Sequence, residues 1–227
     1  MIPILTLSEI ESKLGYAFSD RYEKTQNSVK MFGILFARPD SKLSKEQIVG
    51  SISYFNTLSA DKIDFFCAGY GVSDRSGKLQ DLNKLELING ALHSFSNTAY
   101  LEVVDQLQRQ TNLRTTGGTE LVLTNARYDH ENSAVDIDYS SCIFCDLDQM
   151  LADEAIASIE RFFKQIVDYA DSCDSNDPTW GFSDKKGVHA GGSWLKRLVL
   201  SLLPAKLGEL YSSAQHFAVR DARPIAT

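Results

Sequence analysis

The sequence predicts a mixed α/β fold, and three observations lead to it. Short apolar runs of strand length alternate with stretches in which apolar residues recur every three to four positions, as on one face of a helix. One strand, helix and second strand follow each other within about 40 residues, a length typical of a parallel βαβ unit. Further on, two strands are separated only by a polar turn, which predicts an antiparallel hairpin.

The first half of the chain alternates predicted helices and strands. The elements are a helix at 6–18, a strand at 31–37, a helix at 44–58 and a strand at 62–68. Each helix opens on the spacing of a capping box, formed by Thr6 with Glu9 and by Ser44 with Gln47. Both strands are almost wholly apolar, which favours burial on both faces and parallel pairing across the intervening helix.

The second half predicts a helix, a hairpin and a long amphipathic helix. The elements are a helix from Ser96 or Asn97 to about residue 112, strands at 120–128 and 134–145, and a helix at 149–171. Asp148 precedes the last of these helices as its expected N-cap. Two further helices are expected at 193–203 and 205–217, and a frayed tail over the last ten residues.

These elements divide the chain of 227 residues into three parts. A mixed α/β core domain is expected over residues 1–175, a loop containing Gly and Lys over 176–192, and a helical extension with its tail over 193–227. The length fits one large domain with an appendage.

The core order, β-α-β, then α, then β-β-α, resembles the thioredoxin-like fold over about residues 31–171. Oxidoreductases of that fold carry Cys-x-x-Cys or a single Cys where the helix after the first strand begins. This chain reads Arg-Pro-Asp-Ser-Lys-Leu-Ser there, at 38–44. They also place a cis-proline before the third strand, where residues 114–119 read Arg-Thr-Thr-Gly-Gly-Thr. The resemblance therefore implies the fold without its dithiol chemistry, and an unrelated mixed α/β sandwich is the alternative.

The four cysteines are expected to be reduced thiols of a cytoplasmic protein, because the first residues lack the basic segment of a signal peptide. Cys142 and Cys145 match Cys-x-x-Cys, but positions three apart in a strand point to opposite faces. Neither redox pairing nor a zinc knuckle is therefore predicted for them. A thiol function at Cys67 or Cys173 is a minor alternative.

Composition argues against two classes of function. Acidic residues outnumber basic ones by 30 to 23, for a net charge of −7, whereas a general nucleic-acid binder needs a basic surface. No stretch reaches the roughly 18 apolar residues of a membrane-spanning helix, so no membrane segment is expected. The acidic balance would favour a basic protein partner.

Two loops form a candidate site for an anionic ligand. The candidate residues are Arg114, Thr115, Thr116, Gly117 and Gly118 in the first loop, and Lys185, Lys186 and His189 in the second. Flexible glycines, hydroxyls and cationic side chains next to a helix end suit a phosphate or carboxylate. The alternatives are a helix C-cap with turn chemistry for the first loop and a surface linker for the second.

The predicted C-terminal helices are a candidate interface. Their candidate contact residues are Trp194, Leu198, Leu202, Leu210 and Tyr211. This apolar surface would dock a protein partner or a second copy of the chain, or else pack back onto the core.

No complete catalytic constellation is present in the sequence. Asp136 and Asp138 share a strand face but lack the partners of a metal-dependent nuclease, so neither a metal nor a cofactor is predicted. The sequence favours a non-catalytic interaction or regulatory component, in a setting such as a microbial defence or conflict system or toxin immunity. The alternative is an enzyme or sensor that binds a phosphorylated or otherwise anionic small molecule.

Overall fold

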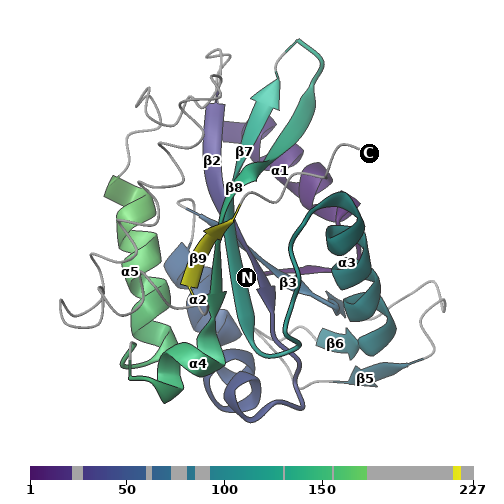
Figure 1. Ribbon diagram of the computed structural model, residues 1–227. Helices are drawn as coiled ribbons and strands as arrows, with labels where there is room; N and C mark the ends of the chain where they lie inside the picture. Colours follow the sequence, from purple (N-terminus) through teal and green to yellow (C-terminus); the bar gives the residue numbers. More distant parts are fainter. Residues whose placement is uncertain are drawn as a thin grey trace.

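A mixed sheet of six strands forms the centre of the computed structural model (Figure 1). Its spatial order is β1 (Ile2–Ile4), β3 (Asp64–Ala68), β2 (Ser28–Phe36), β7 (Glu120–Asp129), β8 (Ala134–Asp146) and β9 (Phe217–Arg220). The first three strands are parallel, and each of the others is antiparallel to the strand before it. The structure describes residues 1–21, 28–59, 63–72, 81–84, 93–129, 131–154, 156–172 and 217–220.

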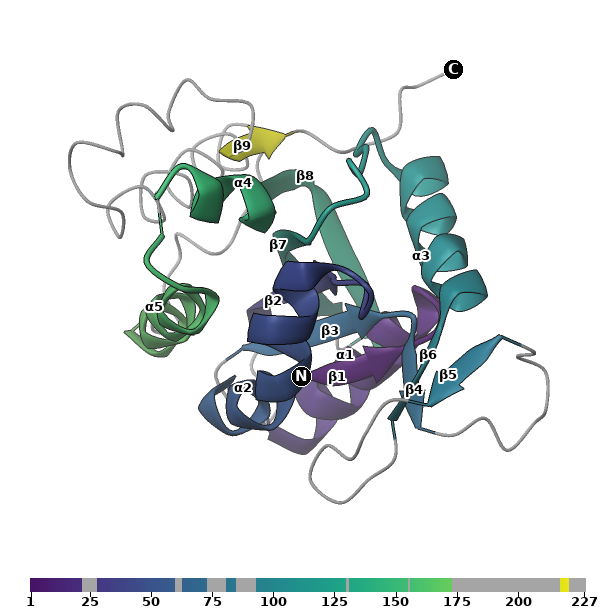
Figure 2. The same cartoon turned by 90° about the horizontal axis from the view of Figure 1, so that it is seen from below.

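Helices cover both faces of this sheet (Figure 2). They are α1 (Ser8–Arg21), η1 (Ser44–Ile48), η2 (Val49–Ser51), α2 (Ile52–Ser59), α3 (Asn97–Gln110), α4 (Leu147–Ala152) and α5 (Ile159–Ser172). Helices α1 and α3 lie on one face, where the ring of Phe18 stacks on that of Tyr128 with centroids 5.5 Å apart. Helices α2 and α5 lie on the other, where the rings of Phe65 and Phe163 are 4.7 Å apart. The fold is therefore mixed α/β with a sheet at its core.

A second, small sheet lies beside the first, next to β1 and α3 (Figure 2). Its order is β4 (Tyr70–Val72), β6 (His93–Ser96) and β5 (Leu82–Lys84), all antiparallel. Gly69 joins β3 to β4 with a φ of +80°, and a Cβ there would lie 2.7 Å from the Cβ of Tyr100. Glycine is needed at this position both for the backbone conformation and for the close approach of α3.

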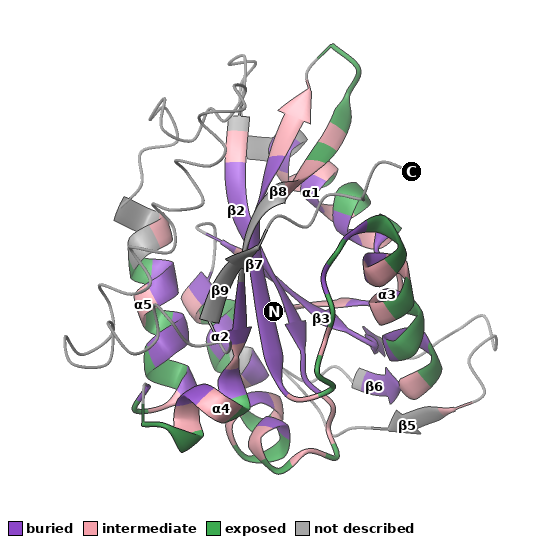
Figure 3. Ribbon diagram, viewed as in Figure 1, coloured by how far each residue is buried: buried purple, intermediate pink, exposed green. Residues whose placement is uncertain are grey.

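The main core is apolar on both sides of the central strands, which are buried along most of their length (Figure 3). Along β2, Phe32 and Ile34 face α1 and α3, whereas Met31 and Leu35 face α2 and α5, because side chains alternate along a strand. This burial on both faces explains why the sequence of β2 is an unbroken apolar run rather than an alternating one.

The structure confirms the predicted mixed α/β class and several of the predicted local features of the core. Strands β2 and β3 are parallel across a helical connection, and β7 and β8 form the predicted antiparallel hairpin. Helix α3 begins where it was predicted to, because the hydroxyl of Ser96 accepts the backbone N–H of Ala99 at 3.0 Å.

The hydrogen bonds at the two predicted capping boxes differ from those that the sequence pattern predicts. Ser44 carries no side-chain cap; its own backbone N–H is donated to the hydroxyl of Ser41 at 3.1 Å, so the cap lies three residues earlier. Gln47 instead accepts the backbone N–H of Ile159 at 3.2 Å and thereby caps α5, which is distant in sequence. Glu9 accepts the N–H of Leu5 at 3.4 Å.

The helix predicted at 149–171 is two helices, α4 and α5. Its N-cap is Asp146, whose carboxylate accepts the N–H of Gln149 at 3.0 Å, and not Asp148 as predicted. Glu154 has a φ of +56° and breaks the helix. The break lets α4 pack against β7 and β8 while α5 packs against α2. The apolar stripe continues across it, so periodicity alone predicts one helix.

Five short strands were not predicted: β1, β4, β5, β6 and β9. Strand β9 lies within residues expected to be the end of a helix and a frayed tail, and it pairs with β8 through Cys145 and Phe217. The predicted loop at 176–192, the helix at 193–203 and residues 205–216 lie outside the described residues. Among the described helices, none has the length and apolar character needed to cross a membrane.

The close packing of β2 gives a testable pair of substitutions. A Cβ at Gly33 would lie 2.7 Å from Cδ1 of Phe65 and 3.1 Å from Cδ1 of Leu121, whereas a Cβ at Gly50 would meet nothing within 4 Å. We expect Gly33→Ala to lower the free energy of unfolding by about 1–3 kcal/mol through overpacking. Gly50→Ala should raise it by about 0.5–1 kcal/mol because alanine favours a helical backbone. Urea denaturation followed by circular dichroism measures both, and equal effects would contradict the packing described.

Candidate functional site

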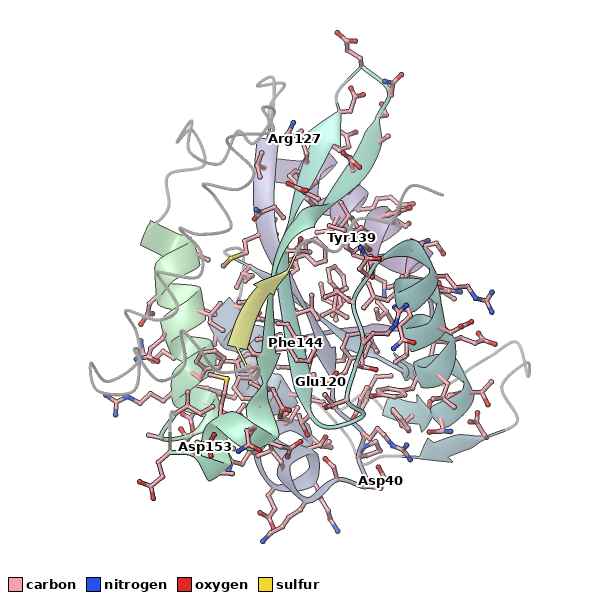
Figure 4. The ribbon with its side chains drawn as sticks, viewed as in Figure 1. Asp40, Glu120, Arg127, Tyr139, Phe144 and Asp153 are labelled. Carbon is pink, nitrogen blue, oxygen red and sulfur yellow. The ribbon has the colours of Figure 1, made fainter. Side chains whose placement is uncertain are left out.

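Four chain segments converge at one edge of the main sheet, the edge at which the parallel strands β2 and β3 end. Phe36 at the end of β2 is paired with Glu120 at the start of β7, which is paired with Asp146 at the end of β8. Figure 4 labels Glu120 on β7. The connections leaving β2 and β3 pass to opposite faces, towards α2 and α3. Open α/β sheets bind ligands at such an edge, which makes it the candidate site of this fold.

The segment after β2 is held by its own polar side chains. Arg38 donates two hydrogen bonds to Asp40, from Nε at 3.1 Å and from Nη2 at 2.9 Å. Ser41 accepts from the N–H of Ser44, and its hydroxyl lies 3.3 Å from that of Thr119. These contacts join the start of η1 to the segment just before β7.

The loop at 114–119, predicted to bind an anion, is bonded to groups of the chain itself. The guanidinium of Arg114 donates to the carbonyls of Gln108 at 3.2 Å and Leu113 at 2.8 Å, so it caps the C-terminal end of α3. The N–H and hydroxyl of Thr116 both donate to Oε1 of Glu120.

A second carboxylate holds the other end of this loop. The N–H of Thr119 donates to Oδ2 of Asp148 at 2.6 Å, and the carbonyl of Thr119 accepts from Leu147 at 2.9 Å. Asp148 therefore fastens the start of α4 to the loop. The N–H groups of Thr116 and Thr119, which an external anion would use, already bind carboxylates of the chain.

Two buried tyrosines lie behind this edge, and their hydroxyls differ in hydrogen bonding. The hydroxyl of Tyr70 donates to the carbonyl of Ala37 at 2.7 Å. The hydroxyl of Tyr100 has no hydrogen-bond partner, although the residue is only 3% exposed. Burial, reinforced by the charge of Glu120, raises the pKa of Tyr100 to about 12.

The described cysteines are unsuited to thiol chemistry. Cys67 and Cys145 are both buried and form no disulfide, and Sγ of Cys67 lies 3.4 Å from Sδ of Met1. Burial raises the pKa of the Cys67 thiol from its ordinary value to about 12, so the reactive thiolate is scarce at neutral pH. The side chain of Cys142, and all of Cys173, lie outside the described residues.

Most of the remaining predicted site residues lie outside the described residues, and three lie in the loop at 114–119. Those outside the described residues are Lys185, Lys186, His189, Trp194, Leu198, Leu202, Leu210 and Tyr211. Thr115, Gly117 and Gly118 lie in the loop, where the hydroxyl of Thr115 accepts from the side chain of Gln108 at 3.4 Å. Within the described ranges, no three His, Cys, Asp or Glu side chains are grouped as a metal site would need.

Sequence reasoning missed the residues that organise this edge, namely Glu120, Tyr100 and Ser41. Glu120 is fully buried at the start of β7, and its only sequence signal is a carboxylate opening an apolar strand. Tyr100 lies on the apolar face of α3, where the sequence pattern predicts an ordinary core residue. The burial of both positions at this edge depends on tertiary contacts and leaves no local pattern.

The two tyrosines provide a matched test of this hydrogen bonding. Tyr70→Phe removes the donor to the buried Ala37 carbonyl and should lower the free energy of unfolding by about 1–2 kcal/mol. Tyr100→Phe removes a hydroxyl with no partner and should leave that free energy unchanged or raise it by up to about 1 kcal/mol. Chemical denaturation of both variants measures the difference, and a larger loss for Tyr100→Phe would show that its hydroxyl is bonded within the fold.

The burial of Cys67 predicts its reactivity. With a pKa of about 12, the thiolate fraction at pH 8 is about one in ten thousand, and the side chain is shielded from reagents. We expect iodoacetamide to leave Cys67 unmodified for hours in the folded protein and to modify it fully in urea, as read by peptide mass spectrometry. Rapid labelling of Cys67 in the folded protein at pH 8 would contradict this expectation and support the alternative of a thiol-based function.

Comparisons with known proteins add no relative to this picture. No protein-family model, no curated protein and no solved structure matches the chain. What the chain does must therefore be inferred from its own contacts.

Proposed function

We propose that this chain is a non-catalytic α/β protein of thioredoxin-like order, without redox cysteines, that acts in the cytoplasm by binding a protein partner. The series β2, α2, β3, α3, β7, β8, α5 supports the fold assignment, because it follows the order β-α-β, α, β-β-α. The parallel pair β2–β3 and the antiparallel pair β7–β8 agree with it as well.

The observation that carries the proposal is that the loop at 114–119 and Ser41, at the carboxyl edge, bond mainly to groups of the chain itself; the buried Tyr100 hydroxyl is an exception. Where a thioredoxin-like oxidoreductase keeps its cysteines, Ser41 caps a helix and contacts Thr119. The neighbouring loop is bonded to Glu120 and Asp148. Polar groups that are already satisfied by one another stabilise the fold and leave few free for a substrate.

The same bonding weakens the alternative of an enzyme or sensor for an anionic small molecule. Such a ligand would displace Glu120 or Asp148 from the loop and would meet Arg114 already engaged at the end of α3. No described contact favours that exchange.

The net charge of −7 supports a basic protein as the partner. A regulatory subunit, a component of a microbial defence or conflict system, and an immunity protein that neutralises a basic toxin all fit that chemistry. The proposed contact element is the C-terminal segment with Trp194, Leu198, Leu202, Leu210 and Tyr211. Its apolar side chains would supply the buried centre of an interface.

Native mass spectrometry of the tagged protein purified from its own host tests this function. We expect a stoichiometric protein partner, and we expect Leu198→Ser with Leu202→Ser to weaken the complex at least about tenfold. Leu101→Ser is the matched control, because Leu101 is 51% exposed on α3. Substitution tests the contact element alone, whereas deleting residues 193–227 would also remove β9 from the sheet.

Three outcomes contradict parts of this proposal. A complex that the double variant leaves intact, with unchanged thermal unfolding, excludes the C-terminal segment as the contact element. A bound small anion with no protein partner would favour the ligand-binding alternative. If Leu101→Ser weakened the complex as much as the double variant does, α3 would belong to the interface.

A further inference from the structure

One half of strand β8 has a paired neighbour on only one side among the described residues. Strand β8 is paired with β7 along both of its halves, but β9 covers only the second half, from Cys142 to Cys145. The first half, Ala134–Asp138, lies in the hairpin that extends beyond β9 (Figure 1), and no described strand is paired with its outer side. We call Ala134–Asp138 the open edge. An unpaired strand edge presents backbone N–H and C=O groups to which another strand can bond.

An irregularity in β8 separates the open edge from the part that β9 covers. Leu123 of β7 is paired with Ile143, but Asn125 of β7 is paired with Asp138. Strand β8 therefore has more residues than β7 between these two pairs, and the extra residues form a bulge. Strand β9 ends beside this bulge. Bulges bend a strand and interrupt its pairing, so the open edge is a separate pairing surface on the same side of β8.

The backbone groups of Val135 and Ile137 point away from β7. The carbonyl of Asp138 points towards β7, because it accepts the hydroxyl of Thr124 at 2.6 Å. In an antiparallel pair every second residue directs its N–H and C=O to the partner strand, and the residues between direct theirs away. Asp136 therefore points its backbone groups inward, as Asp138 does. The open edge offers the N–H and C=O of Val135 and Ile137 to an added strand.

The side chains of the open edge differ between its two faces. Val135 points towards α1, because a Cβ at Gly15 would lie 3.8 Å from its Cγ2, and Ile137 lies on the same face and packs against the core. Asp136 and Asp138 lie on the opposite face, where Asp136 is exposed. Figure 3 shows exposed and half-buried residues along this hairpin. An added strand would continue an apolar pattern on one face and an acidic pattern on the other.

The charge of the hairpin favours a basic strand. Residues 129–138 carry four carboxylates, Asp129, Glu131, Asp136 and Asp138, and no lysine or arginine. Arg127 is paired with Asp136 from the β7 side. A strand with lysine or arginine at alternate positions would place cations beside Asp136 and Asp138 from the outer side. Opposite charges across a strand pair stabilise it.

A second copy of the chain fits the open edge less well than a basic strand does. Two open edges paired antiparallel about Asp136 would bring the two Asp136 carboxylates together. Pairing about Ile137 would place Asp136 of each copy opposite Asp138 of the other. Like charges directly opposite each other destabilise a strand pair, and charged side chains on edge strands oppose self-association.

We propose that the open edge binds an extended segment of a basic protein partner, which adds to the sheet as a further strand. The segment carries lysine or arginine at alternate positions and apolar residues between them. Strand addition takes its affinity from backbone hydrogen bonds and its specificity from alternate side chains. The inference rests on the proposed partner-binding function and adds a second contact to the C-terminal segment, which precedes β9 in the chain and so leads to the same side of β8.

The probe is the peptide acetyl-Val-Lys-Val-Lys-Val-amide, whose central residue would donate its N–H to the open edge. The control, acetyl-Val-Lys-Pro-Lys-Val-amide, has the same charge but lacks that N–H. We expect the probe to shift the amide NMR signals of Val135 and Ile137 in the full-length protein and to slow their hydrogen exchange. The control should bind at least about tenfold more weakly, because proline cannot donate to a strand ladder.

A pair of double variants tests the contribution of charge. Asp136→Asn with Asp138→Asn should weaken probe binding about threefold to tenfold, because it removes two cross-strand charge pairs. Glu102→Gln with Asp105→Asn is the matched control, because it removes the same charge from exposed positions on α3. The control should leave the affinity within about twofold, since salt screens distant exposed charges. Circular dichroism shows whether both variants remain folded.

Four results would overturn the inference. Hydrogen exchange at Val135 and Ile137 in the free protein that is as slow as in the paired residues of β7 would show that the edge is already paired within the chain. A dimer that protects these amides without the probe would assign the edge to a second copy. Equal binding of the proline control, or unchanged affinity of the Asp136→Asn, Asp138→Asn variant, would exclude strand addition guided by charge.

The native complex separates this inference from the proposed function. If the double aspartate variant keeps the native partner with unchanged affinity while Leu198→Ser with Leu202→Ser weakens it, partner binding stands and the open edge is excluded as a contact. If the probe binds as expected but the protein purified from its host carries no protein partner, the proposed function fails and the open edge stands as a strand-binding site.

Discussion

The whole structure depends on the position of β2 between a parallel and an antiparallel neighbour. Nine residues of β2 are paired with β7, and four are paired with β3 on its other edge. Its side chains are buried by helices on both faces, so it has no exposed face on which to place polar groups. Polar contacts are therefore confined to its ends, where Lys30 is paired with Asp64 at 2.6 Å and Arg38 with Asp40.

The two ends of β2 differ in what their charges can do. Lys30 is 5% and Asp64 13% exposed, so losing either would leave a buried charge unpaired, and the pair acts as a fixed link between β2 and β3. Arg38 and Asp40 are far more exposed and can separate without that penalty. Strand β2 therefore has one charged pair held in place by burial, at Lys30, and one that solvent can reach, at Arg38.

The sequence predicted the parts of this fold whose pattern is local. Apolar runs of strand length identified β2 and β3, and Ser96 identified the start of α3. Strands of three or four residues, such as β1, are too short for any periodicity to register. Asp148 shows where prediction from sequence fails at the site. Its position just before a helix predicts an N-cap, but Asp146 is the N-cap, and Asp148 accepts the N–H of Thr119 instead. Which of two neighbouring carboxylates caps a helix is decided by a loop far away in sequence.

The loop at 114–119 shows that residue types alone do not determine which anion a loop binds. Hydroxyls, glycines and backbone N–H groups favour any anion, and the sequence does not distinguish a free phosphate from a carboxylate of the same chain. Glu120 and Asp148 are tethered beside the loop, so their effective concentration is in the millimolar range or above, and a free anion has to compete with them for the same N–H groups. A loop with the composition of an anion site can therefore be completed by carboxylates of its own chain, which then hold it in the fold.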